Sequence, residues 1–142
     1  MGTVIRCALL VLALVAGCGP RTTAAPAPAV PQFLAINRPG ELVDVEAAVV
    51  AGRITIVDFR ADWCGGCEVV EARVRAAVEG DPRIVVRTVD IGDGDSPVAQ
   101  AYGIRGLPHV LVLDRTQALR YRLVGNDAVT AGEVARQLAD ER

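Results

Sequence analysis

Two cysteines separated by two residues carry the clearest chemistry in this sequence. Cys64 and Cys67 follow an apolar segment, residues 54–59, and open a segment with helical spacing. Backbone N–H groups and the helix dipole at a helix N-terminus stabilise a thiolate, so Cys64 is the expected nucleophile. Cys67, one turn further along, is placed to attack a mixed disulfide formed by Cys64. The spacing predicts a pair that exchanges between dithiol and disulfide.

The other two cysteines lie in the N-terminal segment, so Cys64 and Cys67 are the only cysteines expected in the folded domain. Cys7 lies inside an N-terminal apolar run and Cys18 ends it. A Cys-x-x-Cys pair is also half of a zinc site, but tetrahedral zinc normally takes four ligands and no second cysteine pair exists. Redox chemistry without a metal or other cofactor is therefore the interpretation that we favour.

The N-terminal part is typical of an export segment. Its apolar run, residues 7–16, is shorter than the roughly 20 apolar residues that span a membrane. Residues 15–18 (Val-Ala-Gly-Cys) resemble the lipobox of bacterial lipoproteins, in which the peptide is cut before a cysteine that carries lipid. This resemblance implies a signal peptide at 1–17, lipid on Cys18, and a Pro- and Ala-rich spacer over 18–31. An ordinary secreted protein or an uncleaved anchor is the alternative.

Length and composition bound the rest of the chain. A sequence of 142 residues suits one domain, here 32–142, plus a short appendage. The formal net charge of −2 and the lack of a Lys/Arg cluster argue against a nucleic-acid partner. Aromatic residues make up only 4% of the chain, so the core must consist mainly of Val, Leu, Ile and Ala. That composition suits helices packed on a buried sheet.

Hydrophobic periodicity predicts the order β-α-β-α-β-α-β-β-α. The last two strands are joined by a short polar turn and should form an antiparallel hairpin. The helices can cover both faces of a mixed sheet. Strands are expected at 33–36, 54–59, 83–90, 109–114 and 119–124, and helices over Leu42, Val45 and Val49 up to Gly52, at 64–80, at 97–102, and from a capping box of Thr130 and Glu133 onward.

Two motifs in the right order resemble the thioredoxin superfamily. Residues 57–67 (Val-Asp-Phe-Arg-Ala-Asp-Trp-Cys-Gly-Gly-Cys) resemble its active-site strand and turn, and residues 102–108 (Tyr-Gly-Ile-Arg-Gly-Leu-Pro) resemble its second hallmark. Residues 61–64 are similar to the C-terminal domain of the transmembrane thiol-disulfide interchange reductases. The resemblance implies an α/β thioredoxin-like fold, with a central mixed β-sheet flanked by helices on both faces.

The same resemblance implies roles for individual residues. Asp58 matches a buried carboxylate that helps to deprotonate the second cysteine, the alternative being a strand acid that faces solvent. Pro108 matches the cis-proline, beside which Leu107 offers backbone groups to an extended substrate. Trp63 matches an exposed indole beside the nucleophile. The expected catalytic residues are Cys64, Cys67 and Asp58, and the expected substrate-binding residues are Trp63, Leu107 and Pro108.

Several positions depart from the family pattern. Gly66 stands where a proline is usual between the cysteines, Arg60 replaces a tryptophan, and no lysine near 86–88 is available to pair with Asp58. His109, the only histidine, follows the proline motif directly. It is expected either to lower the thiolate pKa, to complete a copper site with the cysteine pair, or to have only a packing or surface role.

These observations predict a thiol-disulfide oxidoreductase that acts on exported proteins bearing disulfides or thiols, as a reductant or electron relay. Its upstream electron donor is expected to be a membrane thiol-disulfide reductase. We expect a monomer held by a lipid anchor on the periplasmic, extracytoplasmic side of the cell envelope. The alternatives are an oxidant of the same fold, or a copper-binding or delivery module that uses Cys64, Cys67 and His109.

Overall fold

The computed structural model describes residues 29–141. The expected signal peptide, Cys18 and most of the expected spacer lie outside these residues. Within the described part, no helix has both the length and the hydropathy needed to cross a bilayer.

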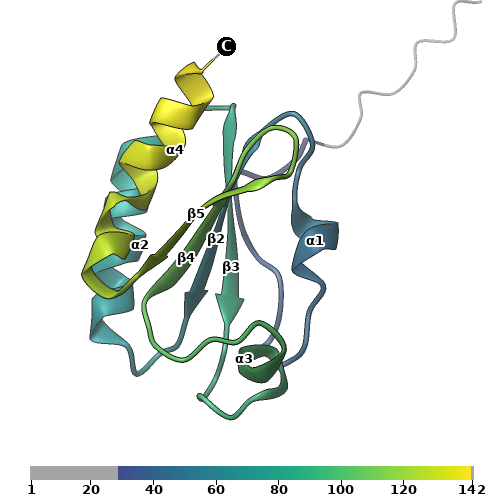
Figure 1. The fold of residues 1–142 in the computed structure, drawn as a ribbon, viewed down its shortest axis with the longest axis vertical. Coiled ribbons are helices and arrows are strands. Elements are labelled where there is room, and N and C mark those ends of the chain that lie inside the picture. Colours follow the sequence, from purple (N-terminus) through teal and green to yellow (C-terminus); the bar gives the residue numbers. More distant parts are fainter. Residues whose placement is uncertain (1–28, 142) are drawn as a thin grey trace, which may run out of the picture.

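A five-stranded mixed sheet forms the middle layer, in the order β1-β3-β2-β4-β5 (Figure 1). β1, β3 and β2 run parallel, whereas β4 is antiparallel to both β2 and β5. The expected antiparallel hairpin is therefore present. The strands are β1 (Phe33–Ala35), β2 (Ile54–Arg60), β3 (Ile84–Asp90), β4 (His109–Leu113) and β5 (Leu119–Val124).

Helices cover both faces of this sheet, as predicted. In Figure 1, α2 (Gly65–Val78) and α4 (Ala131–Asp140) lie on one side, and α1 (Val45–Ala48) and α3 (Pro97–Ala101) lie on the other. A 3-10 helix, η1 (Gly125–Thr130), which the sequence did not indicate, precedes α4. The predicted α/β fold and element order are otherwise confirmed.

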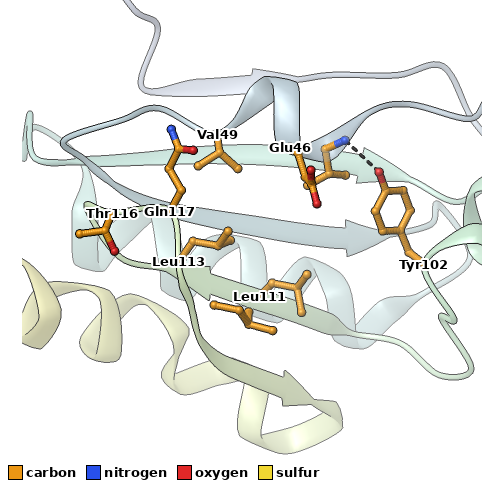
Figure 2. A pocket seen from close by; sticks show the side chains of 9 residues that line it. Glu46, Val49, Tyr102, Leu111, Leu113, Thr116 and Gln117 are labelled. Carbon is orange, nitrogen blue, oxygen red and sulfur yellow. Dashed lines mark hydrogen bonds between the residues drawn. The ribbon is translucent and has the colours of Figure 1, made fainter.

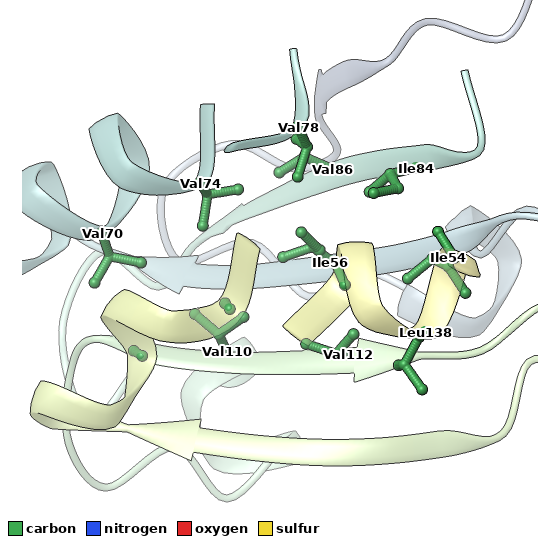
Figure 3. Packing of buried hydrophobic residues seen from close by; sticks show 14 residues of the cluster. Ile54, Ile56, Val70, Val74, Val78, Ile84, Val86, Val110, Val112 and Leu138 are labelled. Carbon is green, nitrogen blue, oxygen red and sulfur yellow. The ribbon is translucent and has the colours of Figure 1, made fainter. Parts of the chain in front are cut away.

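β2 is buried on both faces, which explains its nearly continuous apolar sequence. Ile54 and Ile56 contribute to the core under α2 and α4, whereas Val57 and Phe59 contribute to the core on the opposite face. Figure 3 shows the first of these cores, in which Val70, Val74 and Val78 descend from α2 onto the sheet. Alternation along β2 therefore assigns each side chain to one of two separate cores.

The first helix is shorter than predicted. The periodicity of Leu42, Val45 and Val49 indicated a helix up to Gly52, but α1 contains only four residues and Leu42 is 59% exposed. The Asp44 carboxylate caps the helix by accepting from two backbone N–H groups, which starts the helix after Leu42. At the other end, Val49 is already extended. Local capping therefore overrides the apolar spacing here.

The predicted capping box of Thr130 and Glu133 is wrong. Thr130 has helical backbone angles, and its side chain makes no cap hydrogen bond. Its hydroxyl instead donates to the Asp127 carbonyl at 2.8 Å. Because η1 runs directly into α4, the helix has no extended N-cap residue for a capping box to use.

A close approach between α2 and α4 fixes how the two helices pack. A Cβ added to Gly132 would lie 2.5 Å from the Ala77 Cβ and 3.3 Å from the Val74 Cα. Such a contact is closer than real Cβ atoms accept, so glycine is the residue that lets α4 approach α2.

Replacing Gly132 by alanine should lower the free energy of unfolding by about 1–3 kcal/mol, because the extra methyl group overpacks the helix interface. Urea unfolding followed by circular dichroism measures this change. Gln137→Ala, on the exposed side of the same helix, is the control and should change stability by less than about 0.5 kcal/mol. Equal stability of the Gly132 variant and the parent would contradict the packing described here.

Candidate redox site

The cysteine pair lies where the sequence predicted, at the N-terminus of α2. Cys64 is the N-cap residue, and the two cysteines form a disulfide with their Cα atoms 5.3 Å apart. The Cys64 sulfur accepts a hydrogen bond from the backbone N–H of Cys67 at 3.1 Å. That N–H and the positive end of the helix dipole would stabilise a Cys64 thiolate in the reduced protein. Cys64 is 7% exposed and Cys67 is fully buried, so Cys64 is the more accessible of the two.

Trp63 lies on the surface beside the nucleophile. It is 66% exposed, and its indole Nε1 donates to the Gly92 carbonyl at 2.7 Å. The hydrogen bond fixes the ring against the turn that follows β3, while leaving most of it open to a partner. The expected exposed indole is therefore present.

The proline motif faces the cysteine loop. The Leu107–Pro108 peptide bond is cis, as the resemblance implies. A Cβ on Gly66 would lie 3.3 Å from the Pro108 Cδ, so the glycine between the cysteines allows the two loops to approach closely. Among residues 29–141, the backbone N–H and carbonyl of Leu107 have no hydrogen-bond partner. They remain available to an added strand.

A groove of about 230 Å³ lies beside Trp63 and Leu107. Trp63, Ile91, Ile104 and Leu107 contribute its apolar lining. Asp95 and Arg105 add one charge of each sign. The groove therefore has both apolar and charged lining residues, and it includes the residue before Cys64 and the residue before Pro108.

Asp58 is buried beneath the α2 side of the sheet. It is 2% exposed, and its Oδ1 has no hydrogen-bond partner. Burial, reinforced by the negative charge of Glu71 and opposed by Arg60, raises the pKa of Asp58 to about 7. A carboxyl group with such a pKa can both accept and release a proton near neutral pH.

No cation from β3 pairs with Asp58. Its neighbour in the β2–β3 register is Thr88. Arg87 is buried on the other face, where its guanidinium donates to the backbone carbonyls of Ala48 and Pro31. Arg87, the basic residue of β3, therefore holds α1 and the chain before β1 instead of pairing with Asp58.

His109 is engaged with a neighbouring strand rather than with the cysteines. Its ring packs edge-on against Phe59, and its Nε2 lies 2.7 Å from the Arg122 guanidinium. An arginine only donates, so Nε2 must be the acceptor and its lone pair is engaged. Burial, and then the charge of Arg122, lower the pKa of His109. Within residues 29–141 no group of three His, Cys, Asp or Glu side chains could hold a metal ion.

A larger pocket of about 540 Å³ lies apart from the cysteines. Figure 2 shows Val49, which directly follows α1, above Leu111 and Leu113 of β4, with the Tyr102 hydroxyl hydrogen-bonded to the backbone N–H of Val45 at one end. The pocket exists because the four-residue α1 covers only part of this face. No residue of the predicted site lines it.

Sequence reasoning missed one member of the site. Glu71 is not among the predicted site residues, yet its side chain is only 43% exposed and lines a small cavity with Asp58. The sequence spacing could have identified it, because Glu71 follows Cys67 by four residues and therefore lies one turn along the same side of the α2 helix.

The fold and the site together define a protein that exchanges thiols and disulfides. The thioredoxin family model matches residues 43–137. Mitochondrial thioredoxin-2 of Schizosaccharomyces pombe is 30% identical over 95 residues, covering 67% of this chain and 70% of that protein. An H-type thioredoxin of Fagopyrum esculentum is 31% identical over 75 residues, which is 53% of this chain and 63% of that protein.

Solved structures agree on the fold. A mutant thioredoxin from Halobacterium salinarum NRC-1 superposes with a TM-score of 0.57 at 21% identity, covering 83% of this chain and 98% of that one. The chain belongs to the thioredoxin family. With its Cys64–Cys67 disulfide, it is a thiol-disulfide oxidoreductase.

The titration of Asp58 should make the oxidised protein less stable as the pH rises. The native pKa of about 7 lies above the value of 3.8 in the unfolded chain, so the native state binds the proton more tightly. The free energy of unfolding therefore falls as the pH rises from about 3.8 to about 7. At 1.36 kcal/mol per pH unit, the loss is at most about 4 kcal/mol.

Asp58→Asn should remove this loss. The variant should therefore be more stable than the parent at pH 8, with a difference that shrinks toward pH 4, as measured by urea unfolding across that range. Asp127→Asn, at an exposed position, is the control and should leave the pH dependence in place. A parent protein with a flat profile would contradict the burial argument.

Proposed function

We propose that this protein reduces disulfides in exported proteins through the Cys64–Cys67 dithiol. The observation that carries the proposal is the position of the Cys64 sulfur, which accepts a backbone N–H at the start of α2, one residue after Trp63 of the groove lining. A nucleophile stabilised in this way can attack a disulfide held in that groove.

The reaction proceeds by two exchanges of sulfur. The Cys64 thiolate attacks one sulfur of the substrate disulfide, and the other substrate sulfur leaves with the electron pair of the broken bond. Cys67 then loses its proton to Asp58 and attacks the Cys64 sulfur. The new Cys64–Cys67 bond forms as the bond from Cys64 to the substrate breaks. The substrate leaves as a dithiol, and this protein is left oxidised.

The loop that contains Leu107 and Pro108 positions the substrate. The unpaired backbone N–H and carbonyl of Leu107 fit an extended substrate segment that pairs as a short strand. Trp63 supplies an apolar wall, and the groove has no strong excess of one charge. This arrangement suits unfolded or extended segments of many sequences better than one defined ligand.

The electrostatics of Cys64 favour a reductant over an oxidant. Strong oxidants of this kind owe their potential to a highly stabilised thiolate. Among the described residues, the Cys64 sulfur accepts one hydrogen bond, and no lysine, arginine or histidine side chain donates to it. His109 is engaged with Arg122 instead. Modest thiolate stabilisation leaves the disulfide form favoured, so electrons tend to leave the pair.

The place of action follows from the N-terminal sequence. We propose that Cys18 is lipidated after cleavage behind Gly17, and that the domain works on the extracytoplasmic side of a bacterial envelope. Electrons would then come from a membrane thiol-disulfide reductase, to whose C-terminal domain residues 61–64 are similar. Several acyl chains would hold the protein stably, since each buried CH₂ contributes about 0.8 kcal/mol.

Cys64→Ser should abolish the reduction of insulin, whereas Cys67→Ser should accumulate mixed disulfides with exported proteins. Cys18→Ser is the control and should retain insulin reduction in solution. A reduction potential of about −270 mV for the Cys64–Cys67 pair agrees with a reductant. A potential of about −120 mV would show an oxidant instead. Turnover by the Cys64 variant would contradict the proposal.

Changing Cys18 to alanine should release the protein from the membrane fraction of a bacterial host. The N-terminal peptide of the parent should carry acyl chains in mass spectrometry, and that of the variant should not. Cys7→Ala is the matched control, and its product should remain acylated. An unmodified parent N-terminus would rule out the lipid anchor while leaving the redox proposal intact.

A further inference from the structure

A half-buried carboxylate lies between the buried Asp58 and solvent. Glu71 forms ion pairs with two arginines, Arg60 at 3.6 Å and Arg75 at 3.8 Å. Its side chain is 43% exposed, in contrast to the buried Asp58. Glu71 therefore has one side toward the interior and one side toward water.

A small cavity joins the two carboxylates. Its volume is about 20 Å³, which is enough for one water molecule. Val74 of α2 and Val86 of β3, both visible in Figure 3, form apolar walls, and Thr88 contributes a hydroxyl. The full lining is Phe33, Asp58, Glu71, Val74, Arg75, Val86 and Thr88.

Two buried polar atoms without partners belong to residues on the same face of β2. Among residues 29–141, the buried side-chain nitrogens and oxygens that lack a hydrogen-bond partner are Asp58 Oδ1 and Arg60 Nε. The two residues are two positions apart on β2 and so lie on the same face of the strand. Unpaired buried groups of this kind are normally satisfied by ordered water. The cavity and the unpaired Asp58 Oδ1 that faces it thus point to a solvated connection between Asp58 and Glu71.

We propose that Asp58 exchanges its proton with solvent through this cavity and Glu71, and that Arg60 holds Glu71 in place for the transfer. Glu71 is thus a positioning and relay residue that acts through Asp58. The inference rests on the proposed function, in which Asp58 takes the proton of Cys67.

The reaction leaves a proton on Asp58 that this route can exchange with solvent. When Cys67 attacks the Cys64 sulfur, its thiol proton moves to Asp58, while the released substrate sulfur takes a proton from solvent. The new disulfide leaves Asp58 protonated in a closed interior. That proton returns to Cys67 when the pair is reduced again or leaves to solvent, and on the α2 side it would leave through Glu71, whose carboxylate can accept it and release it to water.

The charges that face Asp58 come from two elements. Arg60 lies on its own strand, and Glu71 and Arg75 lie on α2. β3 contributes the uncharged Thr88, β1 contributes the ring of Phe33, over which the Arg75 guanidinium packs at 4.2 Å, and β4 contributes Val110 opposite Asp58 in the register. The negative charge of Glu71 raises the pKa of Asp58, and the positive charge of Arg60 lowers it.

Two substitutions with opposite charge effects test the proposal in the oxidised full chain, without substrate. Carbon-13 NMR of the Asp58 carboxyl should show a titration midpoint lowered by about 0.5–1 pH unit in Glu71→Gln and raised in Arg60→Gln. After a rapid pH jump, infrared detection of the protonated carboxyl should show that deprotonation of Asp58 is slowed about tenfold or more in Glu71→Gln.

Glu79→Gln and Arg73→Gln are the matched controls, because they make the same charge changes at exposed positions of the α2 segment and its C-cap. They should change neither the midpoint nor the rate. An unchanged deprotonation rate in Glu71→Gln would overturn the relay, even if the midpoint moved. Because neither measurement uses a substrate, a parent protein that fails to reduce insulin would refute the proposed function without affecting this test.

Discussion

The pairing of β2 with a parallel strand on one side and an antiparallel strand on the other is the constraint on which the site depends. Because side chains alternate along a strand, this register places Asp58 under α2 and Phe59 on the opposite face. A slip by one residue would exchange the two and put a carboxylate where an aromatic ring belongs. The same strand ends just before the cysteine loop, so its position also decides where α2 begins.

A buried carboxylate in this layer opposes folding, and the chain tolerates it for its chemistry. Removing a charged group from water without a partner is unfavourable, and the high pKa of Asp58 records that penalty. The three ionised side chains nearest to it all remain partly exposed, where water moderates their effect. The result is a buried group whose proton affinity is set by charged side chains nearer the surface.

The sequence predicted the layers, strand order along the chain and cysteine geometry well, because each depends on local patterns. The apolar run of β2 and the helical spacing after Cys64 determine their elements almost by themselves. Prediction failed where a single side-chain hydrogen bond decided the outcome, as with the Asp44 cap that shortens α1. It also failed for Glu71, because the helical pattern separates polar from apolar faces and says little about a residue at their boundary. The partner of His109 lies on a neighbouring strand, and only the sheet register brings Arg122 to it.

The direction of β1 has a consequence for how the redox site meets its partners. β1 runs parallel to β2, so the chain enters the domain beside the amino ends of the strands, while the cysteines lie beyond the carboxyl end of β2 (Figure 1). Seven residues of β2 separate these two ends by about 20 Å. A domain attached through its N-terminus therefore presents Cys64 on its far side. In such an attached domain, attachment and reactivity would occupy opposite poles, and a large substrate could approach one without meeting the other.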